Sequence, residues 1–124
     1  MSGGRPESGP LIHHELCFGC GRQNLFGLLA ELEAAGAGRV AGRCFLKQDH
    51  QGAQPGTAHD GVIATALSEA MRLARGAGEH MRTLEVRFEE PVPVGSFLAL
   101  DATGESATAS VDGRAVASAR ASWG

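Results

Sequence analysis

Cys17 and Cys20 form a Cys-x-x-Cys pair, and His13 and His14 lie just before it. Thiolate and imidazole groups in such an arrangement are the ligands that zinc prefers in proteins. Further donors lie elsewhere in the chain, at Cys44 and His50. A single Cys-x-x-Cys without a second close pair is a weak signal for zinc, and an odd number of cysteines cannot pair completely. We therefore interpret the cysteines as reduced thiols and expect no bound metal.

A second set of reactive groups lies on a segment that has the period of a helix. Apolar residues fill one face of residues 61–75, and the polar stripe includes Ser68, Glu69 and Arg72. Asp60 lies at the N-cap position, where such a side chain stabilises a helix by about 1 kcal/mol. The helix start carries partial positive charge and can stabilise an oxyanion, with a carboxylate as general base. The structural alternatives are an ion pair for Glu69 and a hydrogen bond to a carbonyl one turn back for Ser68.

The segments around this helix alternate between apolar and polar residues, as β-strands do. The expected strands are residues 28–34 and 39–46, which form a hairpin, and residues 81–90, 96–103, 106–111 and 114–123. Asp112-Gly113 separates the last two strands and is typical of a two-residue hairpin turn.

These elements predict an α+β fold in which one long helix packs on a sheet of five to six antiparallel strands. We expect a flexible N-terminal segment at residues 1–14, because it is rich in Gly, Pro and Ser, and a single domain at residues 15–124. The edges of so small a sheet are most simply covered by a second copy of the chain. We therefore expect a homo-oligomer, either a dimer or a tetramer.

The composition restricts the class of partner. The 124 residues are 43% apolar and 20% charged, with a net charge of −3, which indicates a globular protein and argues against nucleic acid as the main partner. The sequence contains no run of about 18 apolar residues and no segment typical of a secretory signal. We therefore expect a cytoplasmic protein that does not interact with membranes.

Three segments together resemble the hotdog-fold acyl-thioesterase superfamily, in particular its phenylacetate-type branch. Residues 17–28, CFGCGRQNLFGL, are similar to the family's entry segment C-F-x-C-G-x-x-N-P-x-G-L, with Leu25 in place of proline. Residues 50–52 and 55–71 resemble H-Q-G-x-P-G-x-x-H-G-G-x-x-A-T-x-x-D-E-A-M, and residues 86–95 resemble the strand and turn after the helix. The entry segment accounts for both of its cysteines without a metal.

The resemblance implies a curved sheet wrapped around the helix and paired active sites at a dimer interface. It also implies an acyl-CoA or acyl-carrier thioester as substrate, with coenzyme A as part of the substrate and no other cofactor. Gly61 matches the second glycine of H-G-G, whose N–H polarises the thioester carbonyl, and His59 matches the histidine that orients the loop or the thioester.

Two departures from the family's pattern concern the catalytic positions. Asp60 replaces the first glycine, and the family's catalytic acid falls on Ser68. Glu69 is the neighbouring carboxylate, rotated by about 100° around the helix, so Glu69 or Asp60 is the candidate base. The candidate substrate-binding residues are Asn24, Ser68, Arg72 and Thr83.

We therefore expect a homo-oligomeric hydrolase that cleaves an acyl thioester to a free acid and a thiol. The main alternative is a hotdog protein that binds acyl-CoA or a hydrophobic acid without hydrolysis, because the acid position is Ser68. A hotdog dehydratase or hydratase and a purely structural assembly are further alternatives.

Overall fold

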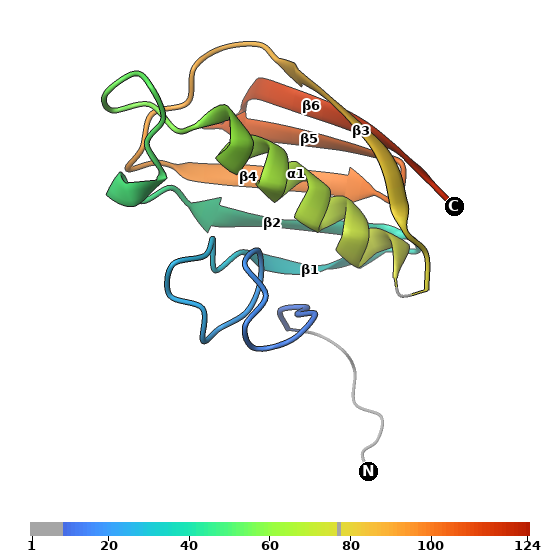
Figure 1. Cartoon of the computed structure of the whole chain (residues 1–124). Coiled ribbons are helices and arrows are strands. Elements are labelled where there is room, and N and C mark those ends of the chain that lie inside the picture. The colour runs from blue at the N-terminus through green and yellow to red at the C-terminus, as the bar shows by residue number, and fades with distance from the viewer. Residues whose placement is uncertain (1–8, 77) are drawn as a thin grey trace.

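The computed structural model describes residues 9–76 and 78–124, so the first eight residues of the expected flexible segment lie outside the described residues. The described residues form six β-strands and one long α-helix (Figure 1). In chain order these are β1 (Glu31–Gly36), β2 (Arg39–Phe45), α1 (Asp60–Arg75), β3 (Met81–Phe88), β4 (Phe97–Thr103), β5 (Ser106–Val111) and β6 (Arg114–Trp123). A short 3₁₀ helix, η1 (Gln48–His50), lies in the loop before α1.

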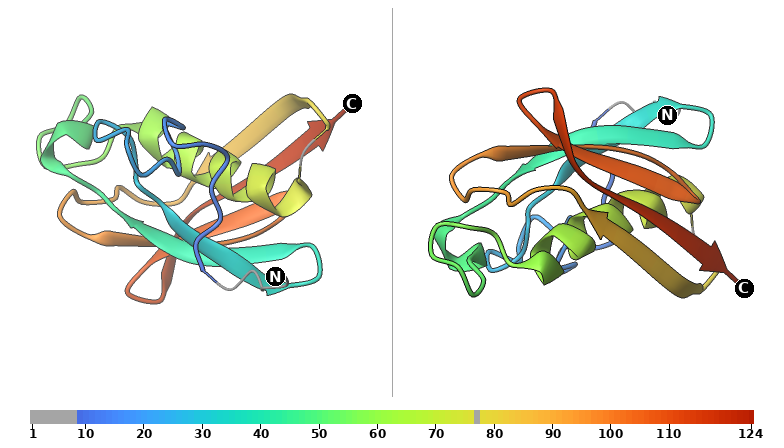
Figure 2. Two further views of the ribbon diagram at one scale, coloured as in Figure 1. Left: turned by 90° about the horizontal axis from the view of Figure 1, so that it is seen from below. Right: turned by 90° about the horizontal axis from the view of Figure 1, so that it is seen from above.

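All six strands belong to one antiparallel sheet with the order β1-β2-β4-β5-β6-β3. The sheet curves around α1, which crosses its concave face and contacts β2, β4, β5 and β6 (Figures 1 and 2). This architecture confirms the predicted α+β hotdog fold. Among the described residues, no helix has the length and apolar character needed to cross a membrane.

The apolar face of α1 forms the centre of the core, as its period predicts. Ile63, Leu67 and Met71 are buried against the sheet, together with the small residues Ala66 and Ala70. The sheet contributes Leu98, Leu100 and Val116, among others. Burying each large apolar side chain stabilises the fold by roughly 1.5–3 kcal/mol, so this face holds α1 in one rotational position.

The start of α1 differs from the prediction. The helix begins at Asp60, and its N-cap is His59, whose Nδ1 accepts a hydrogen bond from the N–H of Gly61 at 2.8 Å. Asp60 is therefore the first helical residue, where its negative charge interacts favourably with the helix dipole. The prediction of Asp60 as N-cap is wrong, because the N–H groups of Val62 and Ile63, from which an N-cap at Asp60 would accept, bond to the carbonyl of His59.

Strands β4 and β5 show the expected alternation of buried and exposed residues, whereas β3 leaves Leu84 and Phe88 exposed. The hairpin turn is confirmed. Asp112 and Gly113 both have positive φ, of 51° and 81°, as a two-residue turn between β5 and β6 requires. The first strand begins later than predicted, at Glu31. The N–H groups of Leu28 and Ala30 bond instead to carbonyls of the preceding segment, those of Phe18 and Gly19, at 2.7 and 2.8 Å.

The segment before β1 is attached to the body of the domain along much of its length. The N–H of Leu11 donates to the carbonyl of Leu32 in β1 at 2.7 Å, inside the range predicted to be flexible. Further along, Cys17 contacts Glu69 of α1. The described part of this segment therefore lies against both the sheet edge and the helix (Figure 1).

Replacing Leu67 by Ala tests the central packing of α1. Leu67 is completely buried, so we expect the free energy of unfolding to fall by about 2–5 kcal/mol through lost burial and a residual cavity. Chemical denaturation followed by circular dichroism measures the change. Leu25→Ala is the control, because Leu25 is 69% exposed and its loss should cost about 0.5 kcal/mol or less. Equal losses in both variants would contradict this assignment of the core.

Candidate functional site

A cavity of about 490 Å³ opens at the N-terminal end of α1. The start of the helix, the loop before it, the end of β3 and part of β6 form its walls. Its apolar wall includes Ile63, Phe88, Val92 and Val116. His59 and Asp60 contribute the polar groups at the helix end. The volume falls within the range of about 300–1,000 Å³ that small-molecule sites occupy.

The His59 ring has a defined orientation and tautomer. Its Nδ1 accepts the hydrogen bond from the N–H of Gly61, so Nδ1 carries no hydrogen. A neutral ring in this position therefore carries its hydrogen on Nε2. The carbonyl of His59 accepts from the N–H groups of Val62 and Ile63, at 2.9 and 3.2 Å, which anchors the residue to the first turn. His59 can thus donate a hydrogen bond to a ligand at the helix start.

Asp60 is exposed and its side chain lines the cavity. A second carboxylate of the cavity wall, Glu90, is held by Arg114, whose Nε lies 3.0 Å from both of its oxygens. A paired carboxylate is less available as a base than an exposed one. Among the predicted catalytic residues, the structure thus brings His59, Asp60 and Gly61 together at one end of α1.

Glu69 lies apart from this group. It is 5% exposed and lies nine positions after Asp60 in α1, which corresponds to about 13 Å along the axis and the opposite side of the helix. It does not belong to the cavity lining among the described residues. Ser68, at the family's acid position, donates to the carbonyl of Thr65 at 3.1 Å, in keeping with the structural alternative.

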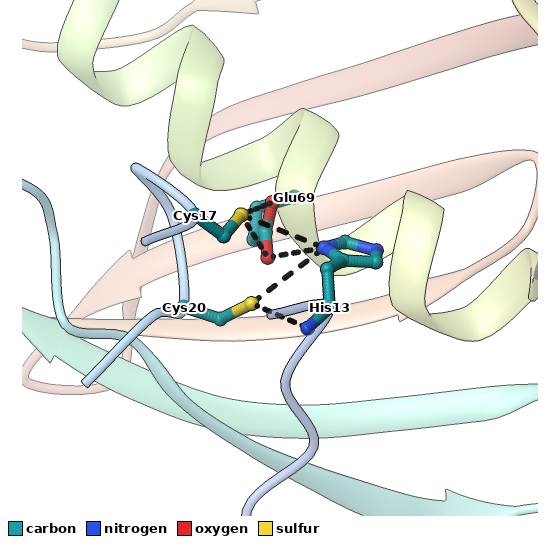
Figure 3. Close-up of side chains that lie close together, drawn as sticks. All are labelled: His13, Cys17, Cys20 and Glu69. Atoms are coloured by element: carbon teal, nitrogen blue, oxygen red, sulfur yellow. Dashed lines mark hydrogen bonds and ion pairs between the residues drawn. The ribbon is translucent and has the colours of Figure 1, made fainter. Parts of the chain in front are cut away.

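Glu69 instead contacts the N-terminal segment (Figure 3). One of its carboxylate oxygens lies 3.0 Å from Nδ1 of His13 and 3.7 Å from Sγ of Cys17. Cys20 Sγ lies 3.5 Å from the same imidazole nitrogen. The four side chains form a cluster of groups that can bind a metal. Burial and the neighbouring Glu69 raise the pKa of the Cys20 thiol far above its usual value.

The other donors that the sequence offers for zinc lie elsewhere. Cys44 belongs to the hydrophobic core, where burial raises the pKa of its thiol to about 12. His50 is buried in η1, and its Nδ1 accepts from the N–H of Lys47 at 2.9 Å. The exposed His14 accepts from the N–H of Leu16 at 3.3 Å.

Among the described residues, none of the predicted substrate-binding residues lines the cavity. Asn24 donates to the carbonyl of Leu16 at 3.0 Å and accepts from the N–H of Phe26 at 3.2 Å, which stabilises the entry loop. Thr83 shares a hydrogen bond of 2.6 Å with Ser122 across β3 and β6. The guanidinium of Arg72 lies 5.9 Å from the ring centre of Trp123.

Sequence reasoning did not assign two parts of the site. The apolar cavity wall combines Phe88, Val92 and Val116 from separate segments, and each has the pattern of an ordinary strand or loop residue. The contact between Cys17 and Glu69 joins positions 52 residues apart. A side chain at Gly19 would overlap the Glu69 carboxylate, but only the folded structure reveals this.

Comparisons with solved structures identify the fold. A thioesterase superfamily protein matches with a TM-score of 0.76 and 24% identity, over 86% of this chain and 59% of that one. The PaaI protein from the phenylacetic acid degradation operon of E. coli matches with a TM-score of 0.68 and 13% identity, over 76% and 77% of the two chains. A phenylacetic acid degradation-related protein from Ralstonia eutropha matches with a TM-score of 0.67 and 19% identity, over 77% and 84%.

The chain thus has the hotdog fold of thioesterase superfamily proteins and phenylacetic acid degradation proteins. It spans less than two thirds of the length of the first of these chains. No protein-family model matches the sequence, and no curated protein matches it at a significant level.

His50 should make the stability of the domain depend on pH. Its burial lowers the pKa of its imidazole, so below about pH 6.5 the unfolded chain binds a proton that the folded chain resists. The contribution of His50 is therefore present above that pH and is lost as the pH falls from about 6.5 to its folded pKa. This one proton changes the free energy of unfolding by at most about 1.4 kcal/mol per pH unit.

Urea denaturation between about pH 7.5 and 5 measures this slope. We expect the slope to be shallower in His50→Asn, because an amide oxygen can still accept from the Lys47 N–H but does not titrate. His14→Asn is the matched control, since His14 is exposed. An unchanged slope in His50→Asn would contradict the assignment.

Proposed function

We propose that the protein hydrolyses an acyl thioester, such as an acyl-CoA, in the cavity at the N-terminal end of α1. The cavity itself supports this most directly, because an apolar wall meets a histidine and an exposed carboxylate at a helix start. An acyl chain requires the apolar wall, and a thioester carbonyl requires the polar end. The hotdog fold is consistent with this reaction, because a thioesterase superfamily protein shares it.

In the proposed complex, the acyl chain lies against Phe88, Val92 and Val116, and its carbonyl oxygen points toward the start of α1. The Nε2–H of His59 donates to this oxygen, and the partial positive charge of the helix end adds to the stabilisation of the oxyanion. Gly61 acts through His59, because its N–H already bonds to Nδ1 of the ring. This differs from the direct contact between Gly61 and the carbonyl that the sequence resemblance implies.

Asp60 is the proposed general base. Its carboxylate removes a proton from water while the resulting hydroxide attacks the carbonyl carbon. The tetrahedral intermediate collapses as the C–S bond breaks, and the departing thiolate takes the proton back from Asp60. The products are the free acid and the thiol, and the reaction requires no cofactor apart from the coenzyme A of the substrate. A cytoplasmic location remains a prediction.

Glu69 is not proposed as the base, although the sequence made it a candidate. It is buried on the opposite side of α1 and is surrounded by His13 and the thiols. About 13 Å along the helix axis separates it from the start of α1, so it does not reach water in the cavity of its own chain.

A second copy of the chain is proposed to complete the cavity. β3 is an edge strand of the sheet, and its apolar side chains Leu84 and Phe88 are 37% and 45% exposed. Exposed apolar groups on a free strand edge are typical of a surface that pairs with another chain. Phe88 also lines the cavity, so a partner at this edge lies next to the bound substrate. We therefore propose a homodimer through β3, alone or within a tetramer.

Binding without hydrolysis is the second candidate function. The observation that favours it is Ser68, which lies where the related family has its acid and uses its hydroxyl on the helix backbone. If Asp60 only stabilises the start of α1 and does not act as a base, the same cavity holds an acyl-CoA or a hydrophobic acid without cleaving it.

Asp60→Asn separates these functions. We expect the purified wild-type protein to release thiol from a panel of acyl-CoA thioesters. Asp60→Asn should lower kcat by about 10²–10⁴-fold, because the variant lacks the base that removes a proton from the attacking water. A colorimetric thiol assay measures the release. Asp112→Asn is the matched control, since Asn tolerates the positive φ of the β5–β6 turn.

Saturable binding of an acyl-CoA with no release of thiol would replace hydrolysis by the second function. Full turnover in Asp60→Asn would remove Asp60 from the mechanism and return the search for the base to Glu89, the other exposed carboxylate of the cavity wall, and to the partner chain.

Leu84→Glu tests the proposed dimer. A charge in the middle of β3 should oppose burial of this edge, so the molar mass in solution is expected to fall from that of a dimer to that of a monomer. Light scattering coupled to size-exclusion chromatography measures it. Glu33→Gln, on the opposite edge strand β1, should leave the mass unchanged. A monomeric wild-type protein would contradict the proposal.

A further inference from the structure

A cluster outside the proposed catalytic cavity joins the N-terminal segment to the middle of α1 (Figure 3). His13, Cys17 and Cys20 come from the segment, and Glu69 comes from the helix. One ligand atom from each lies within 4.8 Å of all the others. We propose that these four side chains bind one zinc ion with tetrahedral geometry, as a site that fastens the N-terminal segment to the helix.

Three of the distances between donor atoms are close to those of such a site. Zinc forms bonds of about 2.3 Å to sulfur and about 2.0–2.2 Å to nitrogen or oxygen, so tetrahedral angles separate a sulfur ligand from either by about 3.6 Å. Nδ1 of His13 lies 3.6 Å from Sγ of Cys17 and 3.5 Å from Sγ of Cys20. The carboxylate of Glu69 lies 3.7 Å from Sγ of Cys17. Small shifts of side chains suffice to place all four donors around one ion.

The backbone around the cluster supports the same assignment. The N–H of His13 donates to Sγ of Cys20 at 3.1 Å, an interaction that stabilises a thiolate ligand. The N–H of Gly21 bonds to the carbonyl of Cys17 at 2.9 Å and closes the Cys-x-x-Cys turn. A side chain at Gly21 would overlap the carbonyl of Glu15, and one at Gly19 would overlap Glu69. Both positions therefore require glycine for the thiols and the carboxylate to converge.

The electrostatics of Glu69 give an independent reason to propose a bound cation. A buried carboxylate is costly unless a positive partner compensates for its lost hydration. Among the described residues, the partners of Glu69 are His13 and the thiols, and the imidazole is positive only when protonated. A divalent cation bound by Glu69 gives the carboxylate a direct positive partner, while the loss of the two thiol protons leaves the net charge of the site unchanged. Two thiolates with an imidazole select zinc over magnesium and calcium, which prefer oxygen ligands.

Four protein ligands leave no open coordination position, which is characteristic of a structural zinc rather than a catalytic one. The proposed ion therefore does not depend on the proposed hydrolysis, and its test needs no substrate. The proposed zinc ion differs from the expectation of no metal, which was based on the Cys-x-x-Cys pair and did not include Glu69 as a ligand.

The test is the metal content of the full-length protein, purified under reducing conditions from cells grown with added zinc. Mass spectrometry of the elements should find about one zinc per chain. Cys20→Ser and Glu69→Gln should each lower this content by at least about tenfold after dialysis, because each removes one ligand. Cys44→Ala and Glu33→Gln are the matched controls for a thiol and a carboxylate outside the cluster, and both should retain the metal.

Cobalt substitution keeps the proposal testable if a variant fails to fold. After removal of zinc by a chelator, Co²⁺ added to the reduced wild-type protein should give thiolate-to-cobalt charge-transfer absorption and tetrahedral d–d bands. The thermal midpoint of unfolding should rise with zinc concentration, because the ion binds the folded state. Less than about a tenth of an equivalent of metal together with no such spectrum would overturn the proposal, as would full metal retention in Cys20→Ser. A Cys17–Cys20 disulfide that persists without metal would overturn it as well.

Discussion

The rotational position of α1 on the sheet determines where every other functional group lies. Burial of Ile63, Leu67 and Met71 against the concave face fixes this position. A helix turns by about 100° per residue, so the direction of every other side chain on it is then fixed as well. Asp60 is directed to the cavity, and Glu69, about two and a half turns later, is directed to the N-terminal segment.

The two carboxylates consequently have different environments although they belong to one helix. Asp60 is exposed at the positively polarised end of α1, where it stays in contact with water and with the contents of the cavity. Glu69 is shielded from water and surrounded by sulfur and imidazole. The same chemical group is thus suited to proton transfer at one site and to holding a cation at the other.

Much of the fold can be predicted from the sequence because its signals are local. Alternation over a few residues gave the strands, the helical period gave α1, and Asp112-Gly113 gave the last turn. The start of α1 was harder, because Asp60 and His59 can both cap a helix and only the geometry of the preceding loop decides between them.

The site was less predictable than the fold, since its parts are far apart in the chain. Spacing could point to Cys17 and Cys20 as a pair, but no periodic pattern links them to Glu69. The polar stripe of α1 suggested that Glu69 faces solvent, whereas the N-terminal segment covers it. The apolar cavity wall is equally hard to predict from the sequence, because Val92 and Val116 meet only after the sheet has formed.

The main-chain bond between Leu11 and Leu32 has a consequence for how the molecule can be shortened. Composition alone would suggest Glu15 as a convenient first residue of a trimmed version. Such a deletion would take away the Leu11 amide and the His13 imidazole together, leaving one carbonyl of β1 and the Glu69 carboxylate without those neighbours. The first described residues are therefore an integral part of the folded unit.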